Sequence, residues 1–233
     1  MLHGFTGSPD SFAELEVPGP AVAPALGGHL AEPASDDFLS EVERLAALMP
    51  NATELFGYSL GGRLALGLLS RYPDRFSHAV IVSAHPGLRT QEERIERQIQ
   101  DGRLARQLRE RGLAEFIAAW EVLPLWETQR TLPDTVKARK RKERLTHTAE
   151  GLASSLMSVG LGQMPDLRQT LAQTACAVDF LVGAQDEKFV ALAEELCCLM
   201  PHARLAVAPN AGHDLVLERP EFCSAYLSKG PPR

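Results

Sequence analysis

The sequence Gly57-Tyr58-Ser59-Leu60-Gly61 fits the pattern G-x-S-x-G, and its setting matters more than the five letters. A short apolar run, Thr53 to Gly57, leads into it, and a helical pattern from Leu60 to Tyr72 follows and is stopped by Pro73. A serine on a sharp strand-to-helix turn sits in a strained backbone conformation, and small neighbours are needed because larger side chains would clash there. The pattern therefore predicts that Ser59 is a reactive serine.

Two later motifs supply the partners that a reactive serine needs. Asp186 ends the sequence GAQD, directly after an apolar run from Val178 to Gly183. His213 lies in NAGHD, directly after a run from Leu205 to Ala208. A serine hydroxyl reacts only when a histidine takes its proton and a carboxylate orients that histidine. The order serine, aspartate, histidine along the chain is the order this kind of turn requires, so we predict a catalytic triad of Ser59, Asp186 and His213.

A fourth motif, His3-Gly4-Phe5-Thr6-Gly7, lies near the start of the chain. A turn of this kind supplies one backbone N–H of an oxyanion hole, and the residue after the serine supplies the other. We therefore expect the hole to be formed by the N–H groups of Phe5 and Leu60, and His3 to be structural. Four elements in this order, spread over nearly the whole chain, predict the α/β-hydrolase fold.

The rest of the sequence agrees with a mostly parallel sheet. Apolar runs such as Ala79 to Ser83 are too short for helices and are typical of strands buried on both faces. Amphipathic helical segments lie between them, one of which runs from Phe38 to Met49 with Ser35 available as its N-cap. Alternation of strands and helices indicates an α/β fold.

The stretch from Pro86 to Pro165 interrupts this alternation. It predicts four or five consecutive helices without a strand, the clearest from Thr90 to Arg111. We therefore expect an α/β-hydrolase core formed by residues 1–85 and 166–233, with a helical cap formed by residues 86–165.

The charge of the predicted cap differs from that of the rest. Between Arg89 and Arg144 lie 14 basic and ten acidic residues, whereas the whole chain has 24 and 30. A basic cap on an acidic body favours an anionic ligand, although a solvated helix face accounts for much of the basic run from Lys137 to Lys142.

Composition excludes several other classes of protein. The 233 residues are 45% hydrophobic and 23% charged, which is typical of a globular protein, and the formal charge of −6 argues against general nucleic-acid binding. The apolar runs are far shorter than the roughly 18 residues of a membrane span, so we expect no membrane insertion. The first ten residues have no signal-peptide pattern, and we expect a cytoplasmic protein. Four cysteines without a CxxC spacing predict neither zinc nor redox chemistry, and we expect no metal and no cofactor.

Several segments of the chain also resemble a single enzyme family. They are LHGFTGS (Leu2–Ser8), GYSLGGRLAL (Gly57–Leu66), HPGLRTQEERIERQ (His85–Gln98), W-x-x-x-P-L-W (Trp120–Trp126), ERL (Glu143–Leu145), GAQDEKF (Gly183–Phe189) and NAGHDLVLERPE (Asn210–Glu221). The family is 2-succinyl-6-hydroxy-2,4-cyclohexadiene-1-carboxylate synthase, the lyase of the menaquinone (vitamin K2) pathway. HPGL followed by ER-x-x-R is much more specific than G-x-S-x-G.

The resemblance implies a lyase that eliminates pyruvate from 5-enolpyruvoyl-6-hydroxy-2-succinyl-cyclohex-3-ene-1-carboxylate. Ser59 would then be a base activated by His213 rather than a nucleophile, and the oxyanion hole would hold the developing enolate. Three carboxylates on this substrate suit guanidinium groups, which pair bidentately with them. Residue by residue, the substrate-binding positions of the family match Arg63, Arg97, Arg144, Tyr58 and Trp120. We expect a small tricarboxylate as the ligand and a monomer or weak homo-oligomer.

Two other functions are compatible with the same triad. A serine carboxylesterase or C–C-bond hydrolase would use Ser59 as a true nucleophile, but it would leave the three arginines without a role. A binding protein that has lost its activity is the third interpretation, and the intact triad argues against it. The family has two strands and a turn before the motif at His3, so we expect either missing upstream residues or a sheet without its first strands and with an unusual edge.

Overall fold

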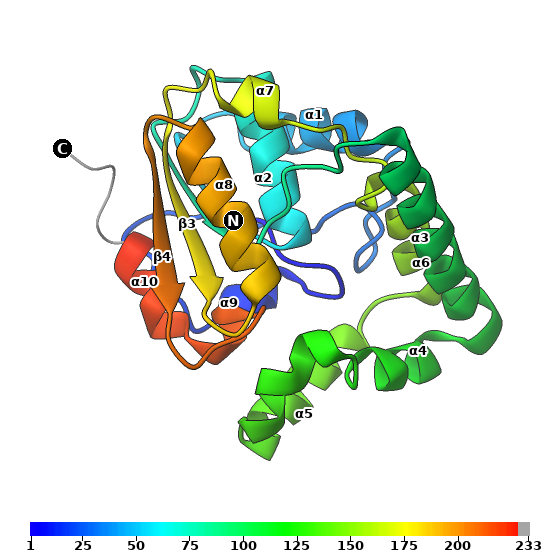
Figure 1. Cartoon of the computed structure of the whole chain (residues 1–233). Coiled ribbons are helices and arrows are strands. Elements are labelled where there is room, and N and C mark those ends of the chain that lie inside the picture. The colour runs from blue at the N-terminus through cyan, green and yellow to red at the C-terminus, as the bar shows by residue number, and fades with distance from the viewer. Residues whose placement is uncertain (228–233) are drawn as a thin grey trace.

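The computed structural model describes residues 1–227, whose centre is a parallel sheet (Figure 1). Its strands are β1 (Glu54–Tyr58), β2 (His78–Val82), β3 (Ala177–Gly183) and β4 (Ala203–Ala208), and they lie in that order across the sheet. Each neighbouring pair is parallel. The four strands predicted from the apolar runs are confirmed, with ends that differ by at most two residues.

The start of the chain continues the sheet beyond β1. Leu2 forms a parallel bridge with Gly57, in which the Leu2 N–H donates to the carbonyl of Phe56 (2.8 Å) and the Tyr58 N–H donates to the carbonyl of Leu2 (3.0 Å). Parallel strands end at the same edge of a sheet, so this bridge places the motif at His3 beside the carboxyl end of β1.

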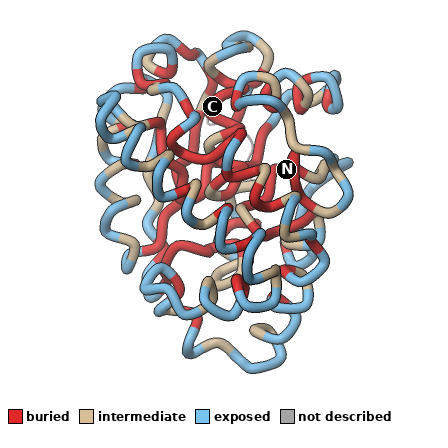
Figure 2. The backbone as a smooth tube through the Cα atoms, turned by 90° about the vertical axis from the view of Figure 1, so that its right-hand side faces the viewer, coloured by how far each residue is buried: buried red, intermediate tan, exposed pale blue. Residues whose placement is uncertain are grey.

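Helices cover both faces of the sheet. One face packs on α1 (Phe38–Leu48), α2 (Leu60–Arg71), α7 (Arg168–Leu171) and α8 (Glu187–Leu199), and the other on η1 (Pro9–Phe12), α9 (Leu215–Glu218) and α10 (Pro220–Leu227). Side chains alternate along a strand, so Ala79 and Ile81 of β2 join the first core and Val80 and Val82 the second. Figure 2 shows the buried residues gathered in this interior.

The segment between β2 and α7 is helical, as predicted. It contains α3 (Gln91–Arg111), α4 (Leu113–Trp120), the 3-10 segment η2 (Pro124–Thr131), α5 (Asp134–Arg144) and α6 (Ala149–Val159). We call this segment the helical insertion. Its helices α3, α4 and α6 share a small core of their own around Leu108, Ile117 and Leu152. Figure 1 shows the helical insertion as an arc beside the sheet.

One local prediction was wrong. The N-cap of α1 is Asp37, whose carboxylate accepts from the Ser40 N–H (2.8 Å), and not Ser35. The Ser35 hydroxyl donates instead to the buried carboxylate of Glu41. Both residues are good N-caps, and the helix begins one residue after the aspartate. Among residues 1–227, no helix is long and apolar enough to cross a membrane.

Candidate active site

Ser59 occupies the turn between β1 and α2 in a strained conformation. Its φ of 51° lies in the left-handed region, which residues other than glycine rarely adopt. Its N–H donates to the carbonyl of Val82 (2.9 Å), which fixes the turn to the neighbouring strand. A Cβ on Gly57 would lie 2.5 Å from the carbonyl oxygen of Gly61, and one on Gly61 would lie 2.1 Å from that of Leu2. Only glycine therefore fits at positions 57 and 61 of this turn.

We predict that Gly61→Ala destabilises the protein by about 3 kcal/mol or more, because the atoms that the new Cβ meets belong to the backbone and cannot move aside. The melting temperature should fall by roughly 6–12 °C. Gly102→Ala is the matched control: it lies in α3 with no atom within 4 Å of the new Cβ, so helix propensity should leave the protein equally or more stable. Equal melting temperatures for the two variants would contradict this packing account.

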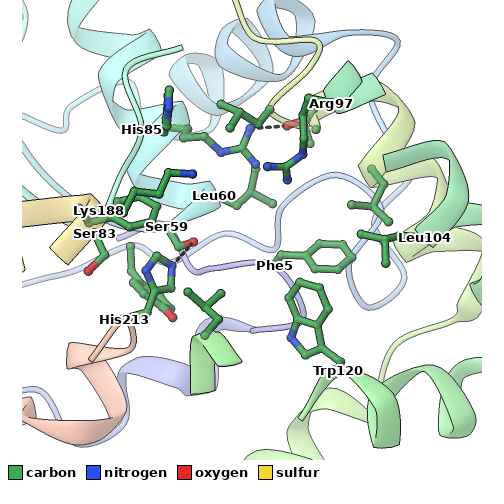
Figure 3. A pocket seen from close by; sticks show the side chains of 18 of the residues that line it. Phe5, Ser59, Leu60, Ser83, His85, Arg97, Leu104, Trp120, Lys188 and His213 are labelled. Carbon is green, nitrogen blue, oxygen red and sulfur yellow. Dashed lines mark hydrogen bonds between the residues drawn. The ribbon is translucent and has the colours of Figure 1, made fainter. Parts of the chain in front are cut away.

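The structure brings Ser59, His213 and Asp186 into one hydrogen-bonded row, of which Figure 3 shows the contact between Ser59 and His213. The Ser59 Oγ lies 3.0 Å from His213 Nε2, and His213 Nδ1 lies 2.7 Å from Asp186 Oδ2. Asp186 directly follows the turn after β3, and His213 lies in the loop after β4, so the parallel sheet delivers all three to one edge. In this arrangement His213 can accept the serine proton while Asp186 holds the imidazole in the required tautomer. The catalytic role of the row stays a prediction.

The loop that carries His213 is held from both sides. The Gly212 N–H donates to Glu218 Oε2 (2.8 Å), and the Thr128 hydroxyl, from the helical insertion, donates to Glu218 Oε1 (3.0 Å). Burial raises the pKa of Glu218 above its ordinary value. The rings of Phe189 and Trp126 lie 4.6 and 5.8 Å from the imidazole of His213, which is itself only 3% exposed. Packing therefore fixes the orientation of this histidine.

Both predicted oxyanion-hole residues line the same cavity as Ser59. Leu60 is the first residue of α2, where N–H groups have no acceptor within the helix. The N–H of Phe5 has no acceptor among residues 1–227. Its direction is set by the peptide bond that it shares with Gly4, whose carbonyl accepts from Gly7 N (3.0 Å) and His3 Nδ1 (2.9 Å). A planar trans peptide points its N–H away from its C=O.

His3 is structural, as its place in the motif predicts. The Leu26 N–H donates to His3 Nε2 (3.2 Å), which leaves the proton on Nδ1 for the Gly4 carbonyl. Burial lowers the pKa of His3 to about 4, so the ring is neutral near pH 7. It is fully buried and has no place in the cavity lining.

The cavity has a volume of about 380 Å³ and lies between the sheet edge and the helical insertion. The predicted aromatic residues Tyr58 and Trp120 both line it. Burial raises the pKa of Tyr58 well above its ordinary value, so its phenol stays protonated. Figure 3 shows Phe5 between Trp120 and Arg97.

Two of the three predicted arginines line this cavity. Arg63, one turn after Ser59 in α2, donates to the carbonyl of Val159 (2.8 Å) and forms no salt bridge within residues 1–227. Burial, together with the nearby Arg97, lowers the pKa of Arg63 to about 9, so it still carries its charge at pH 7. Arg97 donates to the buried carboxylate of Asp101 (2.8 Å). Of these two guanidinium groups, Arg97 is paired with a carboxylate of the described residues and Arg63 is not, so an anion in the cavity would balance the charge of Arg63.

The structure does not bring Arg144 into the Ser59 cavity. Its guanidinium pairs with Glu121 (3.2 Å) and lies 5.5 Å from the centre of the Trp126 ring. It lines a second cavity of about 320 Å³, and the indole of Trp126 is a wall common to both cavities. In this structure the side chain of Trp126 stands between Arg144 and the Ser59 cavity. The substrate-binding role of Arg144 stays a prediction.

Two functional candidates were missed by the sequence analysis. His85 and Lys188 both line the Ser59 cavity, the first just after β2 and the second two residues after Asp186. The Gly87 N–H donates to His85 Nδ1 (3.1 Å). Burial lowers the pKa of His85 to about 3, so its Nε2–H is a neutral donor. The available signal was that each lies within a few residues of the carboxyl end of a strand, His85 after β2 and Lys188 after β3. Within residues 1–227, no group of three or more His, Cys, Asp or Glu residues could hold a metal ion.

A parallel sheet with a strained serine after one strand, and an aspartate and a histidine after two later ones, defines the α/β-hydrolase class. A sequence model of the alpha/beta hydrolase family matches residues 1–225. Within that class, the chain belongs to the family of 2-succinyl-6-hydroxy-2,4-cyclohexadiene-1-carboxylate synthases.

Two relatives by sequence and one solved structure support this assignment. A Bacillus subtilis (strain 168) protein provisionally given that synthase name is 34% identical over 242 residues, covering 98% of this chain and 88% of its own. The synthase of Shigella sonnei (strain Ss046) is 31% identical, covering 98% and 91%. The solved structure of MenH from S. aureus superposes with a TM-score of 0.90 at 27% identity, covering 97% and 90%.

Proposed function

We propose that this protein eliminates pyruvate from 5-enolpyruvoyl-6-hydroxy-2-succinyl-cyclohex-3-ene-1-carboxylate in menaquinone biosynthesis, giving 2-succinyl-6-hydroxy-2,4-cyclohexadiene-1-carboxylate. The observation that carries the proposal is the hydrogen-bonded row of Ser59, His213 and Asp186, which opens into a cavity lined by two guanidinium groups. The row supplies a base, and the guanidinium groups supply the charge that an anionic substrate needs. The similarity to named synthases over nearly the whole chain selects this substrate.

The proposed reaction is a 1,4-elimination. His213 takes the hydroxyl proton of Ser59, and the serine oxygen removes the ring proton next to the succinyl ketone. The electrons of that C–H bond form an enolate whose oxygen is held by the N–H groups of Phe5 and Leu60. When the ketone re-forms, the ring double bond shifts and the C–O bond to the enolpyruvyl group breaks. The group that leaves is the enolate of pyruvate, which gains a proton at carbon to balance the proton that His213 took, so water is not consumed.

Three positive groups within the cavity match the three carboxylates of this substrate. Arg63 and Arg97 supply two of them, and Lys188 supplies the third. A guanidinium pairs with a carboxylate through two parallel hydrogen bonds, whereas an ammonium acts as a point charge. His85 adds a neutral donor beside them. We further propose that the helical insertion is the cap of the active site, because it contributes Arg97, Trp120 and Trp126 to the lining.

Ser59 acts as a base, and no acyl-enzyme forms. A substrate with three charges does not cross a lipid bilayer unaided, which favours action in the cytoplasm, where the substrate would be made and used.

The proposal is tested by measuring pyruvate with a coupled lactate dehydrogenase assay on the tricarboxylate substrate. We expect one pyruvate per diene product, with no burst of nitrophenol when the enzyme is mixed with a simple nitrophenyl ester. The esterase interpretation predicts the reverse, namely a burst on the ester and no pyruvate from the tricarboxylate. That result would replace the lyase by a serine hydrolase of the same fold.

A further inference from the structure

Between His3 and Ser8 the chain forms the loop that presents the Phe5 N–H, and we call this segment the oxyanion loop. Thr6, its central residue, has a φ of 63°, a left-handed conformation that threonine rarely adopts. Such a conformation persists only where surrounding contacts hold it. The contacts that hold the far side of this loop come from the helical insertion.

Glu143, at the end of α5, accepts two hydrogen bonds from the end of the loop and one from η1. Its Oε1 accepts from the Ser8 N–H (2.8 Å), the Ser8 hydroxyl (2.8 Å) and the Ser11 hydroxyl (2.5 Å). Lys140 neutralises the other oxygen, with its Nζ 3.1 Å from Oε2. Burial alone would raise the pKa of Glu143, but Lys140 and the two hydroxyls outweigh it and hold that pKa below its ordinary value. The carboxylate is therefore ionised and fully engaged.

His147, between α5 and α6, binds the loop at Thr6. Its Nδ1 accepts from the Leu30 N–H (2.9 Å), so the proton is on Nε2, which donates to the Thr6 carbonyl (3.1 Å). No other donor to that carbonyl exists within residues 1–227. The imidazole is 5% exposed and packs edge-on against His29, whose ring in turn touches Phe5.

We propose that Glu143 and His147 are positioning residues of the reaction, which hold the oxyanion loop so that the Phe5 N–H meets the developing negative charge. The inference rests on the proposed function, because it concerns the oxyanion hole of that site. Neither residue lines the Ser59 cavity, so neither binds the substrate. Assembly of the oxyanion hole then depends on the helical insertion, although the hole itself is built from the sheet edge and α2.

This role predicts an effect on turnover rather than on substrate binding. Loss of a complete oxyanion-hole donor lowers kcat by about 10²–10³-fold. A loop that holds the Phe5 N–H less firmly should lower kcat by a smaller factor. We expect Glu143→Ala to lower kcat about 10- to 100-fold with KM within about twofold, since Arg63 and Arg97 are untouched. The same loss should appear on a neutral nitrophenyl ester, because its transition state also places negative charge on oxygen.

Two substitutions of His147 separate the contact with Thr6 from the contact with Leu30. In His147→Gln the amide nitrogen lies where Nε2 was and can still donate to Thr6, whereas His147→Asn keeps only an acceptor near Leu30. We expect the glutamine variant to stay within about fivefold of wild-type kcat, and the asparagine variant to lose as much as Glu143→Ala. Glu150→Gln is the matched control, because Glu150 lies on the same helical insertion but pairs with the exposed Arg109.

Phenylboronic acid provides a readout that is independent of either substrate. Its boron accepts the Ser59 oxygen, the serine proton passes to His213, and one oxygen of the resulting tetrahedral anion enters the oxyanion hole. The inhibition constant should rise in Glu143→Ala and His147→Asn by the same factor by which kcat falls. All rates are expressed per folded site, measured by circular dichroism and thermal melting.

Lower melting temperatures with unchanged kcat per folded site and an unchanged inhibition constant would overturn the proposal, because the contacts would then only attach the helical insertion to the core. A rise in KM alone would also overturn it. If the wild-type enzyme releases no pyruvate, the proposed function fails, and the boronic acid measurement still decides the role of Glu143 and His147.

Discussion

Ser59→Ala is expected to lower the rate of pyruvate release at least about 10³-fold, with the same fold and melting behaviour as the wild type. The serine oxygen is the base of the proposed reaction, and it lies 3.0 Å from the imidazole that would activate it. His213→Ala should cost as much, because the two groups act as a unit. Asp186→Asn should cost somewhat less, since Asp186 orients the imidazole without contacting the substrate.

Steady-state kinetics on purified variants, with circular dichroism for the fold, would measure these losses. Ser154→Ala is the matched control, because Ser154 is half-buried on α6 and, within residues 1–227, its hydroxyl bonds to Glu150 alone. It should keep full activity. Retention of more than a tenth of the wild-type rate by Ser59→Ala or His213→Ala would contradict the triad assignment.

Arg63→Ala is expected to lower kcat/KM for the tricarboxylate by about 30-fold to several thousand-fold. Loss of one partner of a desolvated charge pair costs roughly 2–5 kcal/mol, and within residues 1–227 no carboxylate pairs with Arg63 and would compete with the substrate. Arg97→Ala should have a smaller effect, mainly on KM, because the Arg97 side chain is 34% exposed and is already paired with Asp101. Arg63→Lys should rescue poorly, since an ammonium cannot make the bidentate contact.

The comparison with a neutral nitrophenyl ester makes this prediction specific. Hydrolysis of that ester should be nearly indifferent to Arg97→Ala, because it carries no carboxylate to bind. Arg109→Ala, which removes an exposed partner of Glu150, is the control for a charge lost elsewhere on the helical insertion. Wild-type efficiency of Arg63→Ala and Arg97→Ala on the tricarboxylate would favour the esterase interpretation. A raised KM in Arg144→Ala would mean that the Trp126 wall moves when substrate binds.

Much of the fold and the centre of the site follow from local sequence patterns. Buried strands of a parallel sheet are continuous apolar runs, and their carboxyl ends meet at one edge of the sheet. A residue placed directly after such a run, as Asp186 is after β3, is therefore close to any other residue so placed. The same logic predicts the row of Ser59, Asp186 and His213 without any knowledge of side-chain contacts. Local patterns also predict the helices of the insertion.

The partners of side chains on the helical insertion could not be predicted in this way. A charged residue in a helix rich in exposed charge has many possible partners within reach, and only the packing of whole helices selects one. Arg144 lies against Glu121 and Trp126 rather than in the Ser59 cavity. His85 and Lys188 enter that cavity, although their positions in the sequence gave only a weak signal.

The amino-acid sequence by itself determined the class of fold, the order of its strands along the chain and the three residues at the strand ends, because each of these depends on near neighbours in the chain. Only the tertiary structure decided which side chains of the helical insertion reach the cavity and which hold the oxyanion loop. Glu143 and Ser8 are 135 positions apart, and no periodicity or spacing connects them. Their contact depends on how α5 docks on the sheet edge, and that is set by the combined packing of many side chains.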